Sequence, residues 1–431
     1  MAIQSIQTAR IAMESLGIYR GLLQDQVIHK LHILFEHMEK DPQDTIGTLS
    51  RYNEFYHTLV EKGKGSSLKD YIMMKILFHD NAFARWVQKD EMQDMINPIV
   101  EAAAADLDCL YRLGSILPED IEAMGKGLPS LSRWSTSSRL EGEEDANEII
   151  LKFQKALNWG ECIHDLASFH RENGSGIWAK FKGFVWEGEK LQGVVSLDPI
   201  RLSQLIGYEM ERQKVIDNTR AFIDGYPANN MLLYGGRGTG KSSTVKAMLN
   251  EYYQDGLRII EISKKHLESF PMVIRQIKDD PQKFILFIDD LSFEDSEGAY
   301  TSLKAVLEGG LETRPKNVVI YATSNRRHLI KEKFSDRAGL MYGSSDDEVR
   351  AADTMQEKLS LADRFGITVT FSSPNQKQYL EIVDGLVKER GIIIDQEKLH
   401  KKAIQWEMWY NAKSPRTATQ FVDWLEGSVS L

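Results

Sequence analysis

A glycine-rich loop is the feature that most constrains the fold of this chain. The letters YGGRGTGKSS, residues 234–243, follow the apolar run MLL. Residues 235–242 fit the pattern G-x-x-x-x-G-K-[ST], in which glycines let several backbone N–H groups point at one phosphate. The letters STVKAMLNEYYQ after it predict a helix, whose N-terminus favours anions. The loop therefore predicts a phosphate site between a strand and a helix of an α/β domain.

The loop also predicts individual roles. Lys241 is expected to reach the β- and γ-phosphates, and the Ser242 hydroxyl to bind Mg²⁺. The predicted nucleotide-binding residues of the loop are Gly235, Gly236, Arg237, Gly238, Thr239, Gly240, Lys241, Ser242 and Ser243.

Acidic residues end a second apolar run, FILFIDDLSFE at residues 284–294. An aspartate at the end of such a strand is where P-loop proteins hold Mg²⁺, and Asp289 takes that place. Asp290 stands where many ATPases carry a glutamate that activates water. Aspartate is shorter, so Glu294 remains the other candidate for this role.

Three more polar residues follow in a characteristic order. Asn325 comes after the apolar run VVIYAT, where its amide can position a water against the γ-phosphate. Arg364 precedes the last apolar run, GITVTF. Arg416 stands at the start of a C-terminal helical segment, SPRTATQF.

The spacing of apolar residues along the chain changes twice, which predicts three domains. Apolar residues at three- and four-residue spacing predict a mainly helical domain over residues 1–190, with a small β-hairpin within residues 171–195. Short apolar runs alternate with helical segments over residues 191–373, which indicates a parallel sheet covered on both faces. Residues 374–431 are predicted to form a C-terminal helical domain.

The amino-acid composition disfavours some classes of protein. The formal net charge is −10, which argues against non-specific coating of nucleic acid, although a local basic patch remains compatible. The first residues contain no continuous apolar segment of a signal peptide, and no run is long enough to span a bilayer. The two cysteines are far apart, as in a reduced cytoplasmic protein, and we expect no contact with a membrane.

Together these motifs resemble the AAA+ ATPase superfamily, over about residues 198–431. The combination PANNMLLYGGRGTGKSS, IDDLSFE and LSLADRFG behind a helical N-terminal region is similar to a bacterial AAA+ family of ATP-binding proteins with a domain of unknown function. The resemblance implies a core with a five-stranded parallel sheet flanked by helices, a C-terminal helical lid, and ATP with Mg²⁺ as cofactors. It also implies contacts with the adenine around residues 205–208, and we expect Ile206 and Gly207 to line that site.

The same resemblance implies roles for the other polar residues. Asn325 would sense the γ-phosphate, and Arg416 would contact the nucleotide of its own subunit from the lid. Arg364 would act as an arginine finger on the nucleotide of a neighbouring subunit, which predicts a homo-oligomer.

Three functions stay open at this level. The first is an ATPase that remodels an unidentified protein or other macromolecular partner. The second is an ATP-dependent binding switch with negligible hydrolysis. The third is a DNA-associated helicase loader or initiator, because two adjacent acids also occur in that branch of AAA+ proteins. The acidic net charge disfavours this third function, so nucleic acid is a possible but not a favoured partner.

Overall fold

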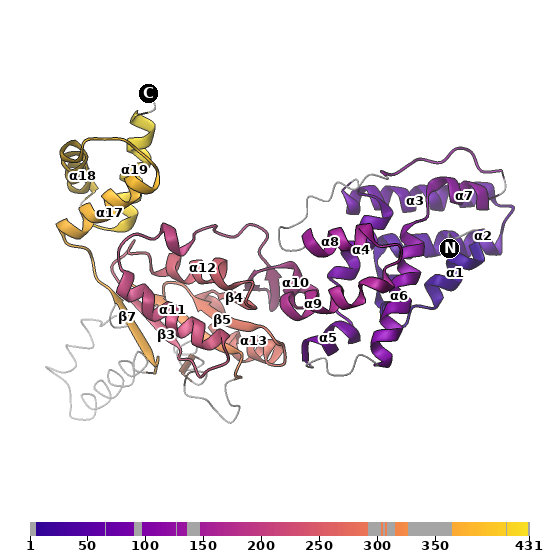
Figure 1. The fold of residues 1–431 in the computed structure, drawn as a ribbon, viewed down its shortest axis with the longest axis horizontal. Helices are drawn as coiled ribbons and strands as arrows, with labels where there is room; N and C mark the ends of the chain where they lie inside the picture. The colour runs from indigo at the N-terminus through magenta and orange to yellow at the C-terminus, as the bar shows by residue number, and fades with distance from the viewer. Residues whose placement is uncertain are drawn as a thin grey trace, which may run out of the picture. The chain divides into compact units, whose positions relative to one another are not determined.

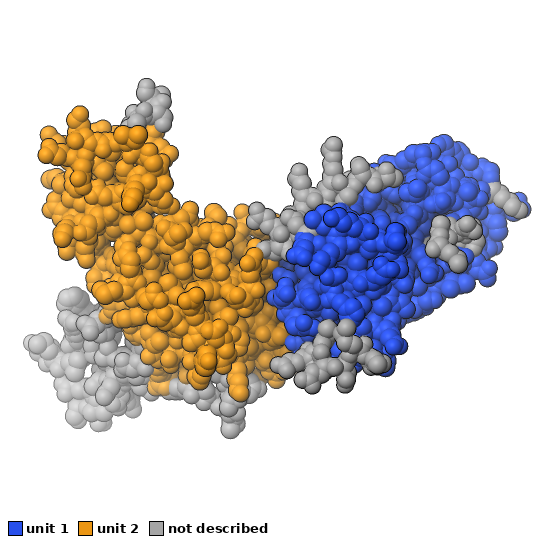
Figure 2. All heavy atoms as spheres, in the orientation of Figure 1, with its two compact units in different colours: residues 1–180 blue, residues 181–431 orange. Residues whose placement is uncertain are grey.

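The computed structural model describes residues 6–64, 66–89, 97–125, 127–135, 147–291, 303–304, 307, 315–325, 364–410 and 412–429. The chain divides into two compact units, Met1–Lys180 and Phe181–Leu431, which Figure 2 shows in two colours. The division falls ten residues before the expected boundary at residue 190, because the hairpin that was expected to end the first domain is part of the sheet of the second.

In its described residues, the first unit is entirely helical (Figure 1). Its helices are α1 (Ile6–Glu14), α2 (Gln26–Lys40), α3 (Thr45–Gly63), α4 (Leu68–Leu77), α5 (Ala82–Lys89), α6 (Pro98–Gly114), α7 (Pro118–Met124), α8 (Asn147–Lys155), α9 (Ile163–Asn173) and α10 (Gly176–Lys180), with short 3-10 turns at Arg20–Gln24 and Gly160–Cys162.

Two carboxylates hold backbone N–H groups in this unit, one at a helix start and one in the segment after α1. Asp25 caps α2 by accepting hydrogen bonds from the backbone N–H groups of Val27 and Ile28. Asp106 of α6 accepts from the backbone N–H of Tyr19 at 2.8 Å. Apolar side chains of all these helical segments form one continuous core, so this unit has the hydrophobic core of an independent domain.

The second unit contains a seven-stranded sheet, in the order β2-β1-β4-β5-β6-β3-β7. The strands are β1 (Gly183–Glu187), β2 (Lys190–Gly193), β3 (Met231–Gly235), β4 (Leu257–Ile262), β5 (Lys283–Ile288), β6 (Val318–Ser324) and β7 (Ile367–Phe371). Strands β3 to β7 are the five predicted apolar runs, and neighbouring ones pair in parallel. The predicted α/β fold is therefore confirmed, with two strands more than expected.

The two additional strands come from the predicted hairpin. β1 pairs with β2 antiparallel and with β4 in parallel, so that Phe184 lies opposite Ile260. Without this pairing β4 would be an exposed edge with unpaired N–H and C=O groups. Trp186 of β1 is fully buried, which the alternating aromatic and polar letters of this segment allow.

The helices of the second unit form two groups. The first group belongs to the sheet domain and contains α11 (Glu209–Ile223), α12 (Lys241–Tyr252) and α13 (Phe270–Ile277), with 3-10 turns at Leu202–Gln204 and Lys264–Ser269. Side chains of α11 and α12 share one apolar core with β3 to β7. The C-terminal helices α17 (Gln376–Glu389), α18 (Gln396–Tyr410) and α19 (Pro415–Val429) have a core of their own and form the predicted lid.

The order of the strands positions the site. β6 lies between β3 and β5, and all three run in the same direction. Their carboxyl ends therefore lie next to one another, where open α/β sheets bind ligands. Within the described ranges, no helix has the length and apolar character needed to cross a bilayer.

His170 makes the first unit sensitive to acid. Its ring is fully buried, and Nδ1 donates to the carbonyl of Gly174 at 3.1 Å. Burial lowers the pKa of His170 to about 4, with nearby His79 acting in the same direction. Below an ordinary histidine pKa of about 6.5, the unfolded chain binds a proton that the folded chain does not, so stability falls as the pH falls from about 6.5 to about 4.

We expect this one group to remove up to about 3 kcal/mol of stability across that window. Urea unfolding at several pH values should show the slope, and His170→Phe should flatten it, because the ring lies beside Phe83 and Phe169. His164→Phe, an exposed position of the same helix, is the control. An unchanged slope in His170→Phe would assign the acid sensitivity to other groups.

The phosphate loop requires glycine at its first position. Gly235 has a φ of +147°, and a Cβ there would lie 1.9 Å from the backbone oxygen of Phe371 in β7. Gly225 has a φ of +83° but open space around it. Gly225→Ala should therefore cost about 1 kcal/mol from backbone strain alone. Gly235→Ala should cost clearly more in urea unfolding, and equal costs would contradict this account.

Candidate functional site

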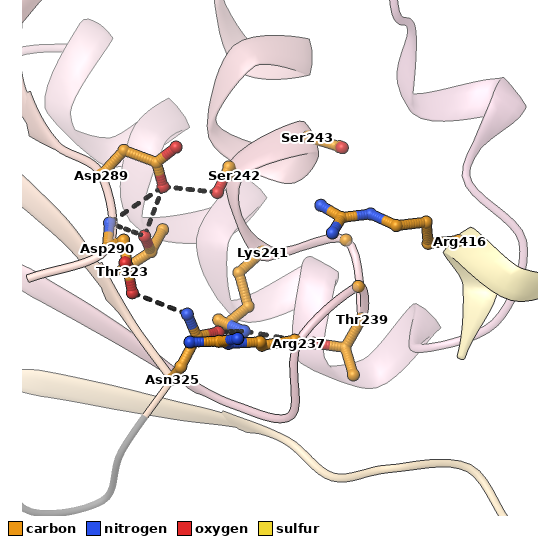
Figure 3. A pocket seen from close by; sticks show the side chains of 12 residues that line it. Arg237, Thr239, Lys241, Ser242, Ser243, Asp289, Asp290, Thr323, Asn325 and Arg416 are labelled. Carbon is orange, nitrogen blue, oxygen red and sulfur yellow. Dashed lines mark hydrogen bonds between the residues drawn. The ribbon is translucent and has the colours of Figure 1, made fainter. Parts of the chain in front are cut away.

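The phosphate loop and the neighbouring strand ends form one cavity of about 350 Å³ (Figure 3). Its lining residues come from the loop, from the ends of β5 and β6 and from the lid: Arg237, Gly238, Thr239, Gly240, Lys241, Ser242, Ser243, Asp289, Asp290, Thr323, Asn325 and Arg416. Segments far apart in the chain thus meet at one place, as the parallel order of the strands requires.

Glycines shape the loop itself. Gly238 and Gly240 have φ values of +76° and +88°, so the backbone turns as only glycine does without strain. α12 begins directly after Gly240. Its first backbone N–H groups have no partner within the helix, and together with the helix dipole they favour an anion in the cavity.

Lys241 points along the loop toward Asn325. Its Nζ donates to the carbonyls of Gly235 and Gly236, at 3.0 and 2.7 Å, and to Asn325 Oδ1 at 3.2 Å. Burial lowers the pKa of Lys241, while the carboxylates of Asp289 and Asp290 act in the opposite direction. The ammonium group is thus held in the cavity by neutral oxygens and nearby negative charge.

Oxygen atoms on two sides of the cavity suit a magnesium ion. Ser242 Oγ donates to Asp289 Oδ1 at 2.5 Å, and Thr323 Oγ1 donates to the same oxygen at 2.6 Å. Mg²⁺ prefers such oxygen ligands and usually takes only one or two carboxylates, with phosphates and water completing its shell. The described residues include no group of three or more His, Cys, Asp or Glu side chains suited to a metal. The pair Ser242 and Asp289 therefore fits Mg²⁺ bound together with phosphates.

Asp290 is held beside this pair in a left-handed backbone conformation, with φ of +52°. Its backbone N–H donates to Thr323 Oγ1 at 2.8 Å. Its carboxylate accepts from Asn325 Nδ2 at 2.6 Å and lies 3.3 Å from Lys264 Nζ. A left-handed aspartate is tolerated better than most residues, and here it directs the carboxylate toward Asn325.

A second cavity, of about 580 Å³, adjoins the first. Its walls come from residues before α11, from Arg212 of α11, from the loop with the start of α12, and from the lid: Ile200, Gln204, Leu205, Ile206, Arg212, Gly238, Thr239, Gly240, Ser243, Ile382, Leu386, Glu389, Arg390, Pro415, Arg416, Thr419 and Gln420. Arg416 and Ser243 line both cavities. The two together offer a polar end for phosphates and a larger, partly apolar end for a base and ribose.

Most of the sequence-predicted residues that the structure describes meet at these two cavities, but four of them do not. Gly235 and Gly236 line neither, and their carbonyls instead accept hydrogen bonds from Lys241. Gly207 lines a different cavity of about 410 Å³, together with Tyr208 and Pro374. Arg364 precedes β7 and lines none of these three cavities. Glu294 lies outside the described residues.

Three site residues were not anticipated. Thr323 was detectable, because it precedes Asn325 by two positions in a strand and two-residue spacing places side chains on one face. No sequence pattern indicates Lys264 or Arg212. The position of Lys264 depends on how its 3-10 turn packs against the core, and that of Arg212 on how α11 packs.

The sheet order, the glycine loop and the helical lid define the second unit as a P-loop fold of the AAA+ type. Residues 179–429, more than half of the chain, match the model of a family described as "Protein of unknown function (DUF815)". The chain belongs to that family.

The comparison with curated proteins gives no significant match. Among solved structures, the Holliday junction branch migration motor RuvB of Thermotoga maritima is similar, with 15% identity over 52% of this chain and 72% of the motor, at a TM-score of 0.32. Two single-site variants of the same motor have 15% identity, the same coverage and TM-scores of 0.31. A likeness of this size carries no information about the activity of this chain.

Thr323 offers a test of the magnesium site. Thr323→Val keeps the shape of the side chain but removes the hydrogen bond to Asp289 and the acceptor for the N–H of Asp290. Loss of a group that orients a metal ligand typically weakens metal binding by about 10- to 100-fold. We expect at least about a tenfold weaker Mg²⁺ dependence of ATP binding, measured by calorimetry at increasing Mg²⁺.

Ser324→Ala is the matched control, because the Ser324 hydroxyl donates to the carbonyl of Leu291 instead. The control should retain the wild-type dependence on Mg²⁺. Equal behaviour of the two variants would show that Thr323 does not orient the metal ligand.

Proposed function

We propose that this protein is a Mg²⁺-dependent ATPase that couples ATP binding and hydrolysis to a change in a macromolecular partner. The observation that carries the proposal is the single cavity in which Lys241, Ser242 and Asp289 meet Asp290, Asn325 and Arg416. Each of these side chains suits one task of phosphoryl transfer, which depends on positioning and on stabilisation of charge.

The glycine loop is proposed to bind the phosphates of ATP before the reaction. Its backbone N–H groups and Lys241 would hold the phosphates. Ser242 and Asp289 would hold Mg²⁺, which would supply positive charge for the phosphates. Arg416 brings a further positive charge from the lid of the same subunit. Its backbone N–H donates to the carbonyl of Gly238 at 3.1 Å, so the lid is joined directly to the loop.

Asp290 is the candidate for orienting the attacking water. Asn325 bridges it to Lys241, because the amide nitrogen donates to Asp290 while the amide oxygen accepts from Lys241. A shift of the lysine toward a phosphate would therefore be transmitted to the carboxylate through one side chain. Glu294 remains the alternative for this role.

Arg364 is proposed to act on a neighbouring subunit. In β7, which pairs in parallel with β3, Ile367 lies opposite Met231 at the start of β3, and Arg364 precedes it. The loop begins at the carboxyl end of β3. Arg364 therefore lies near the opposite, amino-terminal ends of these strands, away from the loop of its own subunit. This placement supports a role in trans and a homo-oligomer.

A switch with negligible hydrolysis is the second candidate function. Asp290 is shorter than glutamate, and its carboxylate is already occupied by Asn325 and Lys264. Both features favour ATP binding over rapid turnover. The sequence-level idea of a DNA loader has no further support, since no described feature of this site favours DNA.

Lys241→Ala should abolish ATP hydrolysis and weaken ATP binding. The phosphates would lose their main positive charge, and loss of a group that stabilises the transition state typically costs about 10²- to 10³-fold in kcat. Phosphate release by purified protein with Mg²⁺ measures the turnover, and Lys246→Ala, one turn further along α12, is the control. Full activity of Lys241→Ala would contradict the ATPase proposal.

The proposed homo-oligomer can be tested by measuring ATP hydrolysis at several protein concentrations. If subunits complete one another's sites, specific activity should rise with protein concentration, and Arg364→Ala should remove that rise while ATP binding is kept. An Arg364→Ala variant with undiminished, concentration-dependent activity would exclude the trans role. ATP binding with no turnover at any concentration would favour the switch.

A further inference from the structure

Arg212 in the first turns of α11 is a buried cation with few partners. Its side chain is 10% exposed, and its one ion pair among the described residues is with Glu209, at 3.4 Å. The Glu209 carboxylate is itself 76% exposed, so this pair is weak. A guanidinium carries five N–H donors, and a buried charge is costly unless hydrogen bonds compensate it.

Arg212 lies at the larger of the two cavities. Arg212 lines the 580 Å³ cavity but not the smaller one that holds the phosphate-loop lysine. Apolar residues of the core and of the lid line the same space, namely Leu205, Ile206, Ile382 and Leu386. Walls of this kind suit a flat aromatic ring, and donors at the edge of the space fix its orientation.

The other cations of this cavity have different tasks. Arg390 is held by carboxylates of α19, at 2.6 Å from Asp423 and 2.9 Å from Glu426. Arg416 lines both cavities and therefore lies at the phosphate end. Arg212 is thus the cation placed to serve the nucleoside end.

The packing before α11 fixes this position. Gly207 and Tyr208 both have positive φ, and the N–H of Arg212 donates to the carbonyl of Tyr208 at 2.9 Å. Ile206 packs so closely on the lid that a Cβ at Gly385 would lie 2.6 Å from it. The segment before the helix therefore packs against the lid, and Arg212 is the residue of α11 that lines the cavity.

We propose that Arg212 recognises the nucleotide base, donating hydrogen bonds to acceptor atoms on the edge of a purine held between Ile206 and the lid. The inference rests on the proposed function and assigns the selectivity for the base to this residue. Purines present N7, and guanine also O6, as acceptors that arginine binds well. A phosphate ligand is disfavoured here because Glu209 lies beside the guanidinium and Glu211 is also near it.

The test compares ligands that share phosphates but differ in the base. Calorimetry would measure binding of ATP, CTP and inorganic tripolyphosphate to the full-length protein and to Arg212→Met, which keeps the apolar stem. We expect ATP to bind at least about tenfold more weakly to the variant, with a smaller preference for ATP over CTP, because the base loses hydrogen bonds from a charged donor. Binding of tripolyphosphate should not change.

Arg220→Met, an exposed position two turns further along α11, is the matched control and should bind ATP as the wild type does. Arg212→Lys retains the charge and should recover part of the affinity. In steady-state hydrolysis, Arg212→Met should raise KM and keep kcat, which a general loss of structure would not do.

Two results would overturn the proposal: unchanged ATP binding by Arg212→Met, or an equal loss of ATP and tripolyphosphate binding. Lys241→Ala separates this failure from failure of the proposed function. If Lys241→Ala binds tripolyphosphate as well as the wild type, the loop is not a phosphate site. If Lys241→Ala loses tripolyphosphate while Arg212→Met binds ATP normally, only the role of Arg212 is wrong.

Discussion

The contact between Ser242 and Asp289 is the interaction on which the rest of the site depends. It joins the start of α12 to the end of β5 across 47 positions of the chain. β3 and β5 run in the same direction with β6 between them, so the contact spans the end of one intervening strand. The hydrophobic core under the sheet supplies the stability for this arrangement, and the polar strand ends use it to bring donors and acceptors together.

The strand between them has a task of its own. β6 is buried along its whole length, yet Thr323 near its end is polar and is followed closely by Asn325. Thr323 holds Asp289 and the backbone of Asp290, and Asn325 links Asp290 with Lys241. The central strand therefore connects the phosphate-binding side of the site with its acidic side.

The lid belongs to the site as much as the sheet does. Arg416 is bound through its backbone to Gly238, and a Cβ at Gly238 would lie 3.0 Å from the Cβ of Arg416. The larger cavity is formed by the lid, the glycine loop, the segment before α11 and Arg212 of α11. A nucleotide in it would contact the glycine loop and the lid at once, which gives ligand binding a direct route to movement of the lid.

Much of the core could be predicted from the sequence because its signals are local. The five apolar runs and the glycine loop with Lys241 and Ser242 are visible as short patterns, and the parallel sheet brings their ends together. The pairing of β1 with β4 was not visible, since it joins residues 76 positions apart, such as Phe184 and Ile260, and depends on an exposed edge. Lys264 and Arg212 were missed for a similar reason, because the packing of their elements decides what they face.

The most direct test of this account is a crystal structure with Mg²⁺ and a non-hydrolysable ATP analogue. We expect the triphosphate in the loop cavity, within reach of Lys241, with Mg²⁺ beside Ser242 and Asp289 and the base in the larger cavity. A triphosphate bound elsewhere, or a metal that has neither Ser242 nor Asp289 in its surroundings, would contradict it.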